Sequence, residues 1–224
     1  MTKRESSLLS IVGRWGFWIA ISVALVLISA FAELSHELFE PSQESGRLLR
    51  FDRAILMFVL RMRRPWLNGL AMDLTALGSP LLIGLFTFVL GAMLLQKGDR
   101  RGAAALAIAS LTSALLTSVL KGLLERPRPQ IIPRLVEVSS FSYPSGHSLA
   151  SSAFYVTAAV VVARQFTTGK QRASVFGFAI CITVLVGASR VYLGVHYPSD
   201  VVAGILVGSA VAAILGALLH RFDR

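Results

Sequence analysis

The residues best suited to chemistry are concentrated in three short segments that lie far apart in the sequence. The first segment contains Lys121 and Arg128, the second contains Ser145, Gly146 and His147, and the third contains Arg190, His196 and Asp200. Together they supply three cations, two imidazoles and one carboxylate. This combination suits the binding and transfer of an anionic group such as phosphate.

Five of these residues are suited to hold the anion itself. Arg128 and Arg190 offer planar guanidinium groups that fit tetrahedral oxyanions, and Lys121 adds a point charge. Ser145 and Gly146 stand where a helix is expected to begin, so backbone N–H groups and the helix dipole favour negative charge there. Gly146 has no side chain and lets the backbone approach the anion closely. We expect a phosphate site.

The two histidines can take different catalytic roles in phosphoryl transfer. His196 and Asp200 are four residues apart, which is one helical turn if the last helix begins early. The carboxylate can then accept a hydrogen bond from one imidazole nitrogen and leave the other free to attack phosphorus. His147 would protonate the departing oxygen and later activate water, while the three cations would stabilise the transition state.

The polar residues also allow other interpretations. His147, His196 and Asp200 could form a facial triad of metal ligands, but three neighbouring cations would oppose a bound metal ion, so we predict neither a metal nor another cofactor. Four further residues are predicted to be ordinary interfacial groups without a catalytic role. They are His36, His220, Arg126 and Arg134.

The composition indicates that the elements positioning these residues lie in a membrane. Hydrophobic residues make up 54% of the 224 residues, and charged residues make up 15%, against about 25% in an ordinary soluble protein. The net charge of +10 fits basic loops that face anionic headgroups, so we expect no nucleic-acid partner. The single cysteine, Cys181, excludes an intramolecular disulfide. We predict one membrane-embedded domain over residues 1–224.

Six charge-poor runs approach the length of about 20 residues that a bilayer core requires. They are Trp15–Ala32, Leu74–Leu95, Gly102–Leu120, Ser148–Ala163, Ala173–Ser189 and Val201–Leu219. Strand-like alternation is absent and the backbone must satisfy its own hydrogen bonds in lipid, so these runs predict an all-α bundle of six transmembrane helices. Within the second run, Ser79 and Pro80 predict a local helix start. The first run exceeds the apolar stretch of a typical signal peptide, and we expect it to be a retained anchor.

The distribution of basic residues predicts the orientation of the bundle. Six spans place both termini on one side, and the loops on that side are short, where the positive-inside rule is most reliable. The basic residues on that side are Lys3, Arg4, Arg14, Lys97, Arg100, Arg101, Arg164, Lys170, Arg172, Arg221 and Arg224. We therefore expect cytoplasmic termini, with the three chemistry-bearing segments on the outer face of a bacterial inner membrane.

The segment Phe51–Met72, between the first two spans, mixes apolar residues with arginines. This pattern predicts an amphipathic helix that lies on the outer leaflet, and Pro65 interrupts it. A solvated basic face without a lipid role explains the same pattern equally well.

The three segments together resemble the signature of the type 2 phosphatidic acid phosphatase superfamily. The resemblance rests on Lys121 with Arg128-Pro129, on Pro144-Ser145-Gly146-His147, and on Ser189-Arg190 followed by His196 and Asp200. It implies a six-helix membrane enzyme that needs no metal and works through a phosphohistidine at the outer face. It also implies that His196 is the nucleophile, that Asp200 orients it, and that the other six candidates surround the phosphate.

The resemblance leaves the substrate open among undecaprenyl diphosphate, phosphatidylglycerol phosphate, phosphatidic acid and a lipid A phosphate. The apolar spans and an outward-facing site require an amphiphile whose headgroup reaches the outer leaflet. A lipid phosphate or diphosphate phosphatase is the leading hypothesis. The alternative is a non-catalytic protein that binds or transports lipid phosphates, although anion binding alone does not need His147, His196 and Asp200. The preferred lipid and the oligomeric state cannot be predicted from the sequence.

Overall fold

The computed structural model describes residues 3–39 and 45–222, with side chains described for 15–39 and 46–222. This part of the chain forms eight helices and no strands, which confirms the prediction of an all-α fold. The helices are α1 (Lys3–Phe39), α2 (Ser45–Met62), α3 (Pro65–Ala76), α4 (Pro80–Gln96), α5 (Arg100–Leu124), α6 (Gly146–Ala163), α7 (Gly169–Tyr192) and α8 (Pro198–Phe222).

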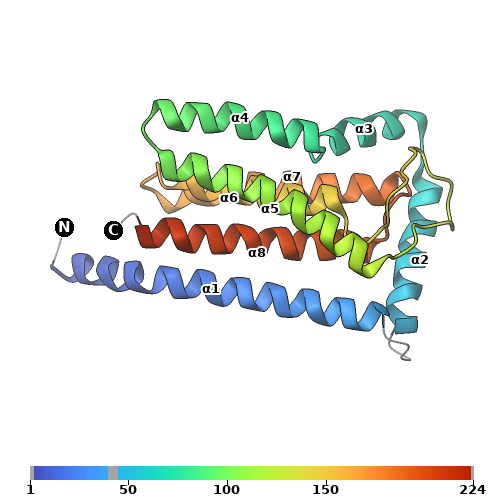
Figure 1. Cartoon of the computed structure of the whole chain (residues 1–224), viewed down its shortest axis with the longest axis horizontal. Coiled ribbons are helices and arrows are strands. Elements are labelled where there is room, and N and C mark those ends of the chain that lie inside the picture. Colours follow the sequence, from blue (N-terminus) through green and yellow to red (C-terminus); the bar gives the residue numbers. More distant parts are fainter. Residues whose placement is uncertain (1–2, 40–44, 223–224) are drawn as a thin grey trace.

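The helices other than α2 run lengthwise in a bundle, and α2 lies across one end of it (Figure 1). Five helices in the described residues, namely α1, α5, α6, α7 and α8, are long and apolar enough to cross a membrane. Helices α3 and α4 meet the same test as a pair, with a bend of 47° between them. The number of candidate spans therefore agrees with the six predicted.

The second span differs from its predicted form because the helix breaks within Leu74–Leu95. Helix α3 ends at Ala76 and α4 begins at Pro80, with Ser79 as its N-cap. The Ser79 side chain accepts a hydrogen bond from the Leu82 N–H at 3.3 Å, and Pro80 has no N–H to continue the preceding helix. The structure thus confirms the helix start predicted at Ser79 and Pro80 and corrects the continuous span.

The segment predicted as one amphipathic helix, Phe51–Met72, is divided between α2 and α3. The chain leaves the helical conformation at Arg63 and Arg64, directly before Pro65 at the first position of α3. Helix α2 buries Asp52 and Leu56 and exposes Phe51 and Phe58. Its crosswise orientation in Figure 1 is the one expected of a helix lying along a membrane surface.

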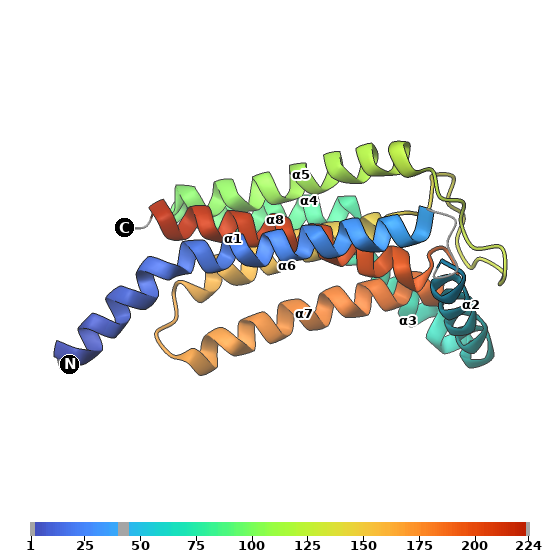
Figure 2. The same cartoon turned by 90° about the horizontal axis from the view of Figure 1, so that it is seen from below.

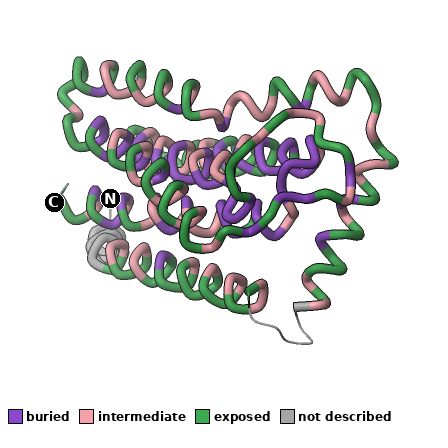
Figure 3. The backbone as a smooth tube through the Cα atoms, turned by 45° about the vertical axis from the view of Figure 1, so that its right-hand side comes forward, coloured by how far each residue is buried: buried purple, intermediate pink, exposed green. Residues whose placement is uncertain are grey.

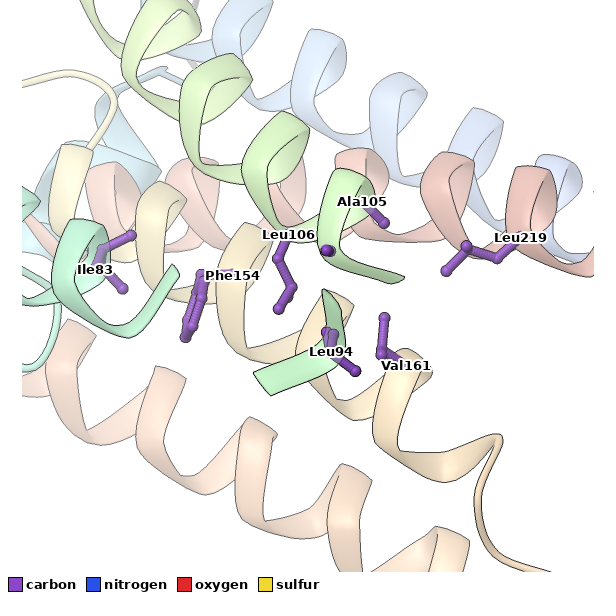
Figure 4. Close-up of a cluster of buried hydrophobic side chains, with 8 residues drawn as sticks. Ile83, Leu94, Ala105, Leu106, Phe154, Val161 and Leu219 are labelled. Carbon is purple, nitrogen blue, oxygen red and sulfur yellow. The ribbon is translucent and has the colours of Figure 1, made fainter. Parts of the chain in front are cut away.

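Helix α6 is the centre of the bundle and packs against α5, α7 and α8, while α1 packs mainly on α8 (Figure 2). Buried residues gather in these inner helices and near the end covered by α2 (Figure 3). One hydrophobic cluster joins α4, α5, α6 and α8 (Figure 4), and it includes Ile83, Leu94, Ala105, Leu106, Phe154, Val161 and Leu219. Large apolar side chains also cover the outer faces, as lipid-facing helices require.

Glycines let α6 and α8 approach each other closely. A Cβ at Gly208 would collide with the Leu149 carbonyl oxygen, and a Cβ at Gly204 would lie 2.5 Å from the Ser145 carbonyl oxygen. Small residues at such crossings allow backbones to meet in membrane proteins. The close approach also brings the first residues of both helices together, since the Ser145 N–H donates to the Asp200 carbonyl at 2.9 Å.

Candidate active site

A cavity of about 470 Å³ lies near the end of the bundle that α2 covers. Its polar part contains six of the eight predicted site residues: Lys121, Arg128, Gly146, His147, Arg190 and His196. Its apolar part is formed mainly by α4 and α5 and includes Pro80, Ile83 and Leu111. The structure therefore brings three distant segments of the sequence together around one space.

His196 is buried in the loop between α7 and α8, with one ring nitrogen facing a carboxylate. Nδ1 lies 3.3 Å from Asp200 Oδ2. With the proton on Nδ1, the lone pair of Nε2 is left facing Arg128 NH1 at 3.2 Å. Helix α8 begins only at Pro198. His196 therefore lies in the bend before this helix and Asp200 in its first turn, whereas the spacing predicted one helical turn containing both residues.

The protonation state of His196 follows from its surroundings. Burial lowers the pKa of His196 to about 4, because the charged imidazolium loses its hydration. Arg128 and Arg190 act in the same direction, while Asp200 opposes them. The ring is therefore neutral at pH 7, which is the form that can act as a nucleophile.

Asp200 is fully buried, and both of its oxygens have partners. Oδ2 accepts hydrogen bonds from the Tyr197 N–H at 2.9 Å and from the Ser142 hydroxyl, in addition to His196. Oδ1 accepts a hydrogen bond from Arg126 NH1 at 2.5 Å. Four contacts fix the orientation of this carboxylate toward the imidazole.

The loop before α6 holds two of the cations at the cavity. Arg128 Nε donates to the Ser140 carbonyl at 2.6 Å, and its NH1 donates to the Val195 carbonyl at 2.6 Å. Lys121 Nζ donates to the Phe141 carbonyl at 2.8 Å and to the Ser140 hydroxyl at 3.1 Å. Burial lowers the pKa of Arg128, but a guanidinium keeps its charge near neutral pH.

Arg190 reaches the cavity from the last turn of α7. Its NH1 donates to the Thr75 hydroxyl at 2.9 Å, which ties this side chain to α3. Its Nε is buried and has no hydrogen-bond partner in the described part of the protein. A buried guanidinium N–H without a partner beside a cavity suits an anionic ligand.

The residues at the start of α6 do not all line the cavity, contrary to the prediction. Ser145 is fully buried and caps the helix by accepting a hydrogen bond from the Ser148 N–H at 3.4 Å, and its side chain does not line the cavity. Gly146 and His147 do line it. The helix start therefore offers backbone N–H groups to the cavity, while the Ser145 hydroxyl is used for capping.

The prediction that Arg126 is an ordinary interfacial charge is wrong. Arg126 is only 7% exposed, and it forms ion pairs with Asp200 at 2.5 Å and with Asp52 of α2 at 2.9 Å. Burial alone would lower the pKa of Arg126, but the two carboxylates together raise it. Arg134, which was predicted in the same way, is exposed. In the sequence, the one relevant signal is the single aspartate among the arginines of α2.

Three other polar residues near the site escaped prediction from the sequence. They are Thr75, Ser140 and Ser142, each of which contacts a predicted site residue. Serine and threonine are frequent in this chain, and nothing in their spacing distinguishes these three. As for the metal hypothesis, no group of three His, Cys, Asp or Glu side chains in residues 15–39 and 46–222 is arranged to hold a metal ion.

Comparison with known proteins identifies the family. Residues 102–224 match the PAP2 superfamily, which is the type 2 phosphatidic acid phosphatase group. Phosphatidylglycerophosphatase B of Bacillus subtilis is 38% identical over 174 residues, covering 77% of this chain and 83% of the relative. Decaprenylphosphoryl-5-phosphoribose phosphatase of Mycobacterium tuberculosis is 31% identical over 158 residues, covering 69% and 82%.

Solved structures agree with this assignment. The crystal structure of a transmembrane PAP2-type phosphatidylglycerolphosphate phosphatase from Bacillus subtilis matches with a TM-score of 0.75 and 33% identity, covering 89% of this chain and 95% of the other. The structure of Aquifex aeolicus LpxE matches with a TM-score of 0.51 and 22% identity, covering 75% and 93%, and shows similarity of fold. This chain therefore belongs to the PAP2 superfamily and is a membrane lipid phosphatase.

Proposed function

We propose that this protein removes phosphate from a lipid phosphate monoester or diphosphate through a covalent phosphohistidine on His196, without a metal. The observation that carries this proposal is the position of His196. Its Nδ1 faces Asp200 at 3.3 Å, while the ring lines a cavity shared with Lys121, Arg128 and Arg190. A neutral imidazole with one nitrogen oriented by a carboxylate and the other beside an anion site is equipped for attack on phosphorus.

The first chemical step transfers the phosphoryl group to the enzyme. The Nε2 lone pair of His196 forms a bond to phosphorus while the bond from phosphorus to the lipid oxygen breaks. His147 lines the same cavity and donates a proton to the departing oxygen. The Nδ1 proton stays between His196 and Asp200, whose negative charge stabilises the positive charge that develops on the ring.

The second step regenerates the enzyme. His147, now without that proton, accepts one from a water molecule, and the water oxygen attacks phosphorus. The bond between Nε2 and phosphorus breaks, its electron pair returns to His196, and inorganic phosphate leaves. In both steps the equatorial oxygens gain stabilisation from Lys121, Arg128 and Arg190.

The shape and lining of the cavity support an amphiphilic substrate. One part presents cations and histidines, and the other presents apolar groups of α4 and α5 such as Ile83 and Leu111. A phosphate headgroup fits the first part and the start of a hydrocarbon chain fits the second. The names of the two enzymes described above, phosphatidylglycerophosphatase B and decaprenylphosphoryl-5-phosphoribose phosphatase, also give lipid phosphates as their substrates. The candidates for this chain are the four lipids left open by the sequence: phosphatidylglycerol phosphate, undecaprenyl diphosphate, phosphatidic acid and a lipid A phosphate.

The site is proposed to face the outside of a bacterial inner membrane, with both termini in the cytoplasm. Helix α1 begins and α8 ends at one end of the bundle, and α2 and the loop over residues 125–145 lie at the other (Figure 1). The short loops and the adjoining helix ends at the first end contain Lys97, Arg100, Arg101, Arg164, Lys170 and Arg172. The positive-inside rule supports a cytoplasmic position for that end.

A phosphate-release assay on a lipid panel tests this proposal. Purified protein in detergent should release phosphate from at least one of the four candidate lipids, and His196→Ala should abolish that release. Lipid binding by the variant should largely survive, because the three cations remain in place. A protein that binds these lipids and releases no phosphate would instead support the alternative of a binding or transport protein.

A further inference from the structure

A buried chain of charges connects the crosswise helix α2 to Asp200. It starts at Asp52, which has no exposed surface and lies in the middle of α2. Asp52 Oδ1 accepts a hydrogen bond from the Ser199 N–H at 3.0 Å, and its Oδ2 accepts from the Ser199 hydroxyl at 2.5 Å and from Arg126 NH2 at 2.9 Å. Ser199 directly precedes Asp200, so Asp52 contacts the start of α8 next to the site.

Arg126 is the link between the two carboxylates. Its NH2 donates to Asp52, and its NH1 donates to Asp200 Oδ1 at 2.5 Å and to the Ser199 hydroxyl at 2.8 Å. The guanidinium also lies over the ring of Tyr197, with its central carbon 4.1 Å from the ring centre. A guanidinium that is hydrogen-bonded to carboxylates on two sides and covered by an aromatic ring on one face has little freedom to rotate.

We infer that Arg126 and Asp52 are positioning residues for the phosphoryl transfer, acting through Asp200. Arg126 engages Oδ1, so the carboxylate must direct Oδ2 at His196 Nδ1. Asp52 pairs with the other side of Arg126 and partly neutralises the positive charge of the guanidinium. The negative charge of Asp200 therefore stays available to the imidazole of His196. The inference rests on the proposed role of His196 as nucleophile.

The energetics favour this role over simple stabilisation of the fold. Burying a guanidinium and two carboxylates costs desolvation energy, and apolar residues of similar volume often stabilise a fold as well or better. The chain therefore gains little stability from this arrangement compared with an apolar contact. A fixed orientation of Asp200 is something that an apolar contact cannot supply.

The test separates positioning from folding with paired variants. Arg126→Gln leaves Asp52 buried without a charge partner, which is expected to lower the midpoint temperature of thermal unfolding. Asp52→Asn combined with Arg126→Gln removes both charges and should restore much of that stability. Arg53→Gln, at an exposed arginine next to Asp52 on the same helix, is the matched control. Phosphate release gives kcat and KM for each purified protein.

We expect Arg126→Gln to lower kcat by roughly 100-fold with little change in KM, as a misplaced catalytic group does. The double variant should regain stability while kcat stays low. In an Asp200→Asn background, Arg126→Gln should cause no further loss, because the group that it positions is already absent.

Two results would overturn the inference. One is a double variant whose kcat returns close to that of the unchanged protein, which would mean that the ion pair only stabilises the fold. The other is a full additional loss when Arg126→Gln is added to Asp200→Asn. If His196→Ala retains activity, the proposed nucleophile is wrong instead, and this outcome is distinguishable because it does not involve Arg126.

Discussion

Gly146, the first residue of α6, offers a sharp test of how α5 and α6 position the site. An alanine Cβ at this position would lie 2.8 Å from Cγ2 of Thr117 on α5, whereas ordinary contact begins at 3.4 Å. Either the Thr117 side chain or the two helices must therefore shift by about 0.6 Å, which is 3.4 minus 2.8. Overpacking of this kind costs about 1–3 kcal/mol of stability.

The same displacement should slow catalysis. Lys121 lies one helical turn after Thr117 on α5, and His147 follows Gly146, so we expect a shift at this contact to move two groups of the cavity apart. Because a misplacement near 1 Å costs about 100-fold in rate, we expect Gly146→Ala to lower kcat/KM by roughly 10- to 100-fold.

A second substitution should reverse much of this effect. Thr117→Ser removes Cγ2 and keeps Oγ1, whose 3.6 Å separation from the added Cβ is ordinary contact. Phosphate release and thermal unfolding should both recover in the combined variant. Gly122→Ala, also on α5, meets no atom within 4 Å and should leave activity unchanged. A combined variant as slow as Gly146→Ala alone would refute the reasoning, since the methyl group would then obstruct something other than Thr117.

Three further predictions concern metal, pH and topology. Activity should persist in a chelator and be inhibited by vanadate, whereas loss in chelator with recovery on adding a divalent metal would contradict the mechanism. Burial lowers the pKa of His196 from 6.5 to about 4, so between these pH values the folded protein binds fewer protons than the unfolded chain. The free energy of unfolding should therefore fall as pH is lowered from about 6.5 to 4. Thermal unfolding of His196→Asn should lack the part of the pH dependence that His196 contributes. The same pH dependence in this variant as in the unchanged protein would contradict the prediction. With Cys181→Ala as background, an impermeant thiol reagent should label Ser139→Cys in intact cells and Thr167→Cys only after lysis, and the reverse pattern would place the site inside.

The sequence predicted the meeting of distant segments because their polar residues stand at the ends of apolar runs. Lys121 ends one run, His147 begins the next, and Arg190 ends the one after it, so alternating spans must bring them to the same end of the bundle. The structure places these three residues around one cavity with Arg128 and His196. The catalytic roles given to them stay predictions.

The parts that sequence reasoning missed depend on contacts between distant residues. Arg126 is 74 positions from Asp52, and nothing local shows that a helix lying across the bundle brings the two together. Ser145 is a different case, because its position before a helix predicts capping as readily as phosphate contact. The break at residues 77–79 is similar, because Ser79 and Pro80 predict the start of a helix but do not show that the preceding helix must end.

The most direct test of the central claim is to trap the covalent intermediate. Rapid quenching of a single turnover with lipid labelled on the transferred phosphate should yield labelled protein. The label should be stable to alkali and labile to acid, as expected of a phosphohistidine, and peptide mapping should place it on His196. Turnover at a normal rate with no label on His196, or with the label on another residue, would contradict the account.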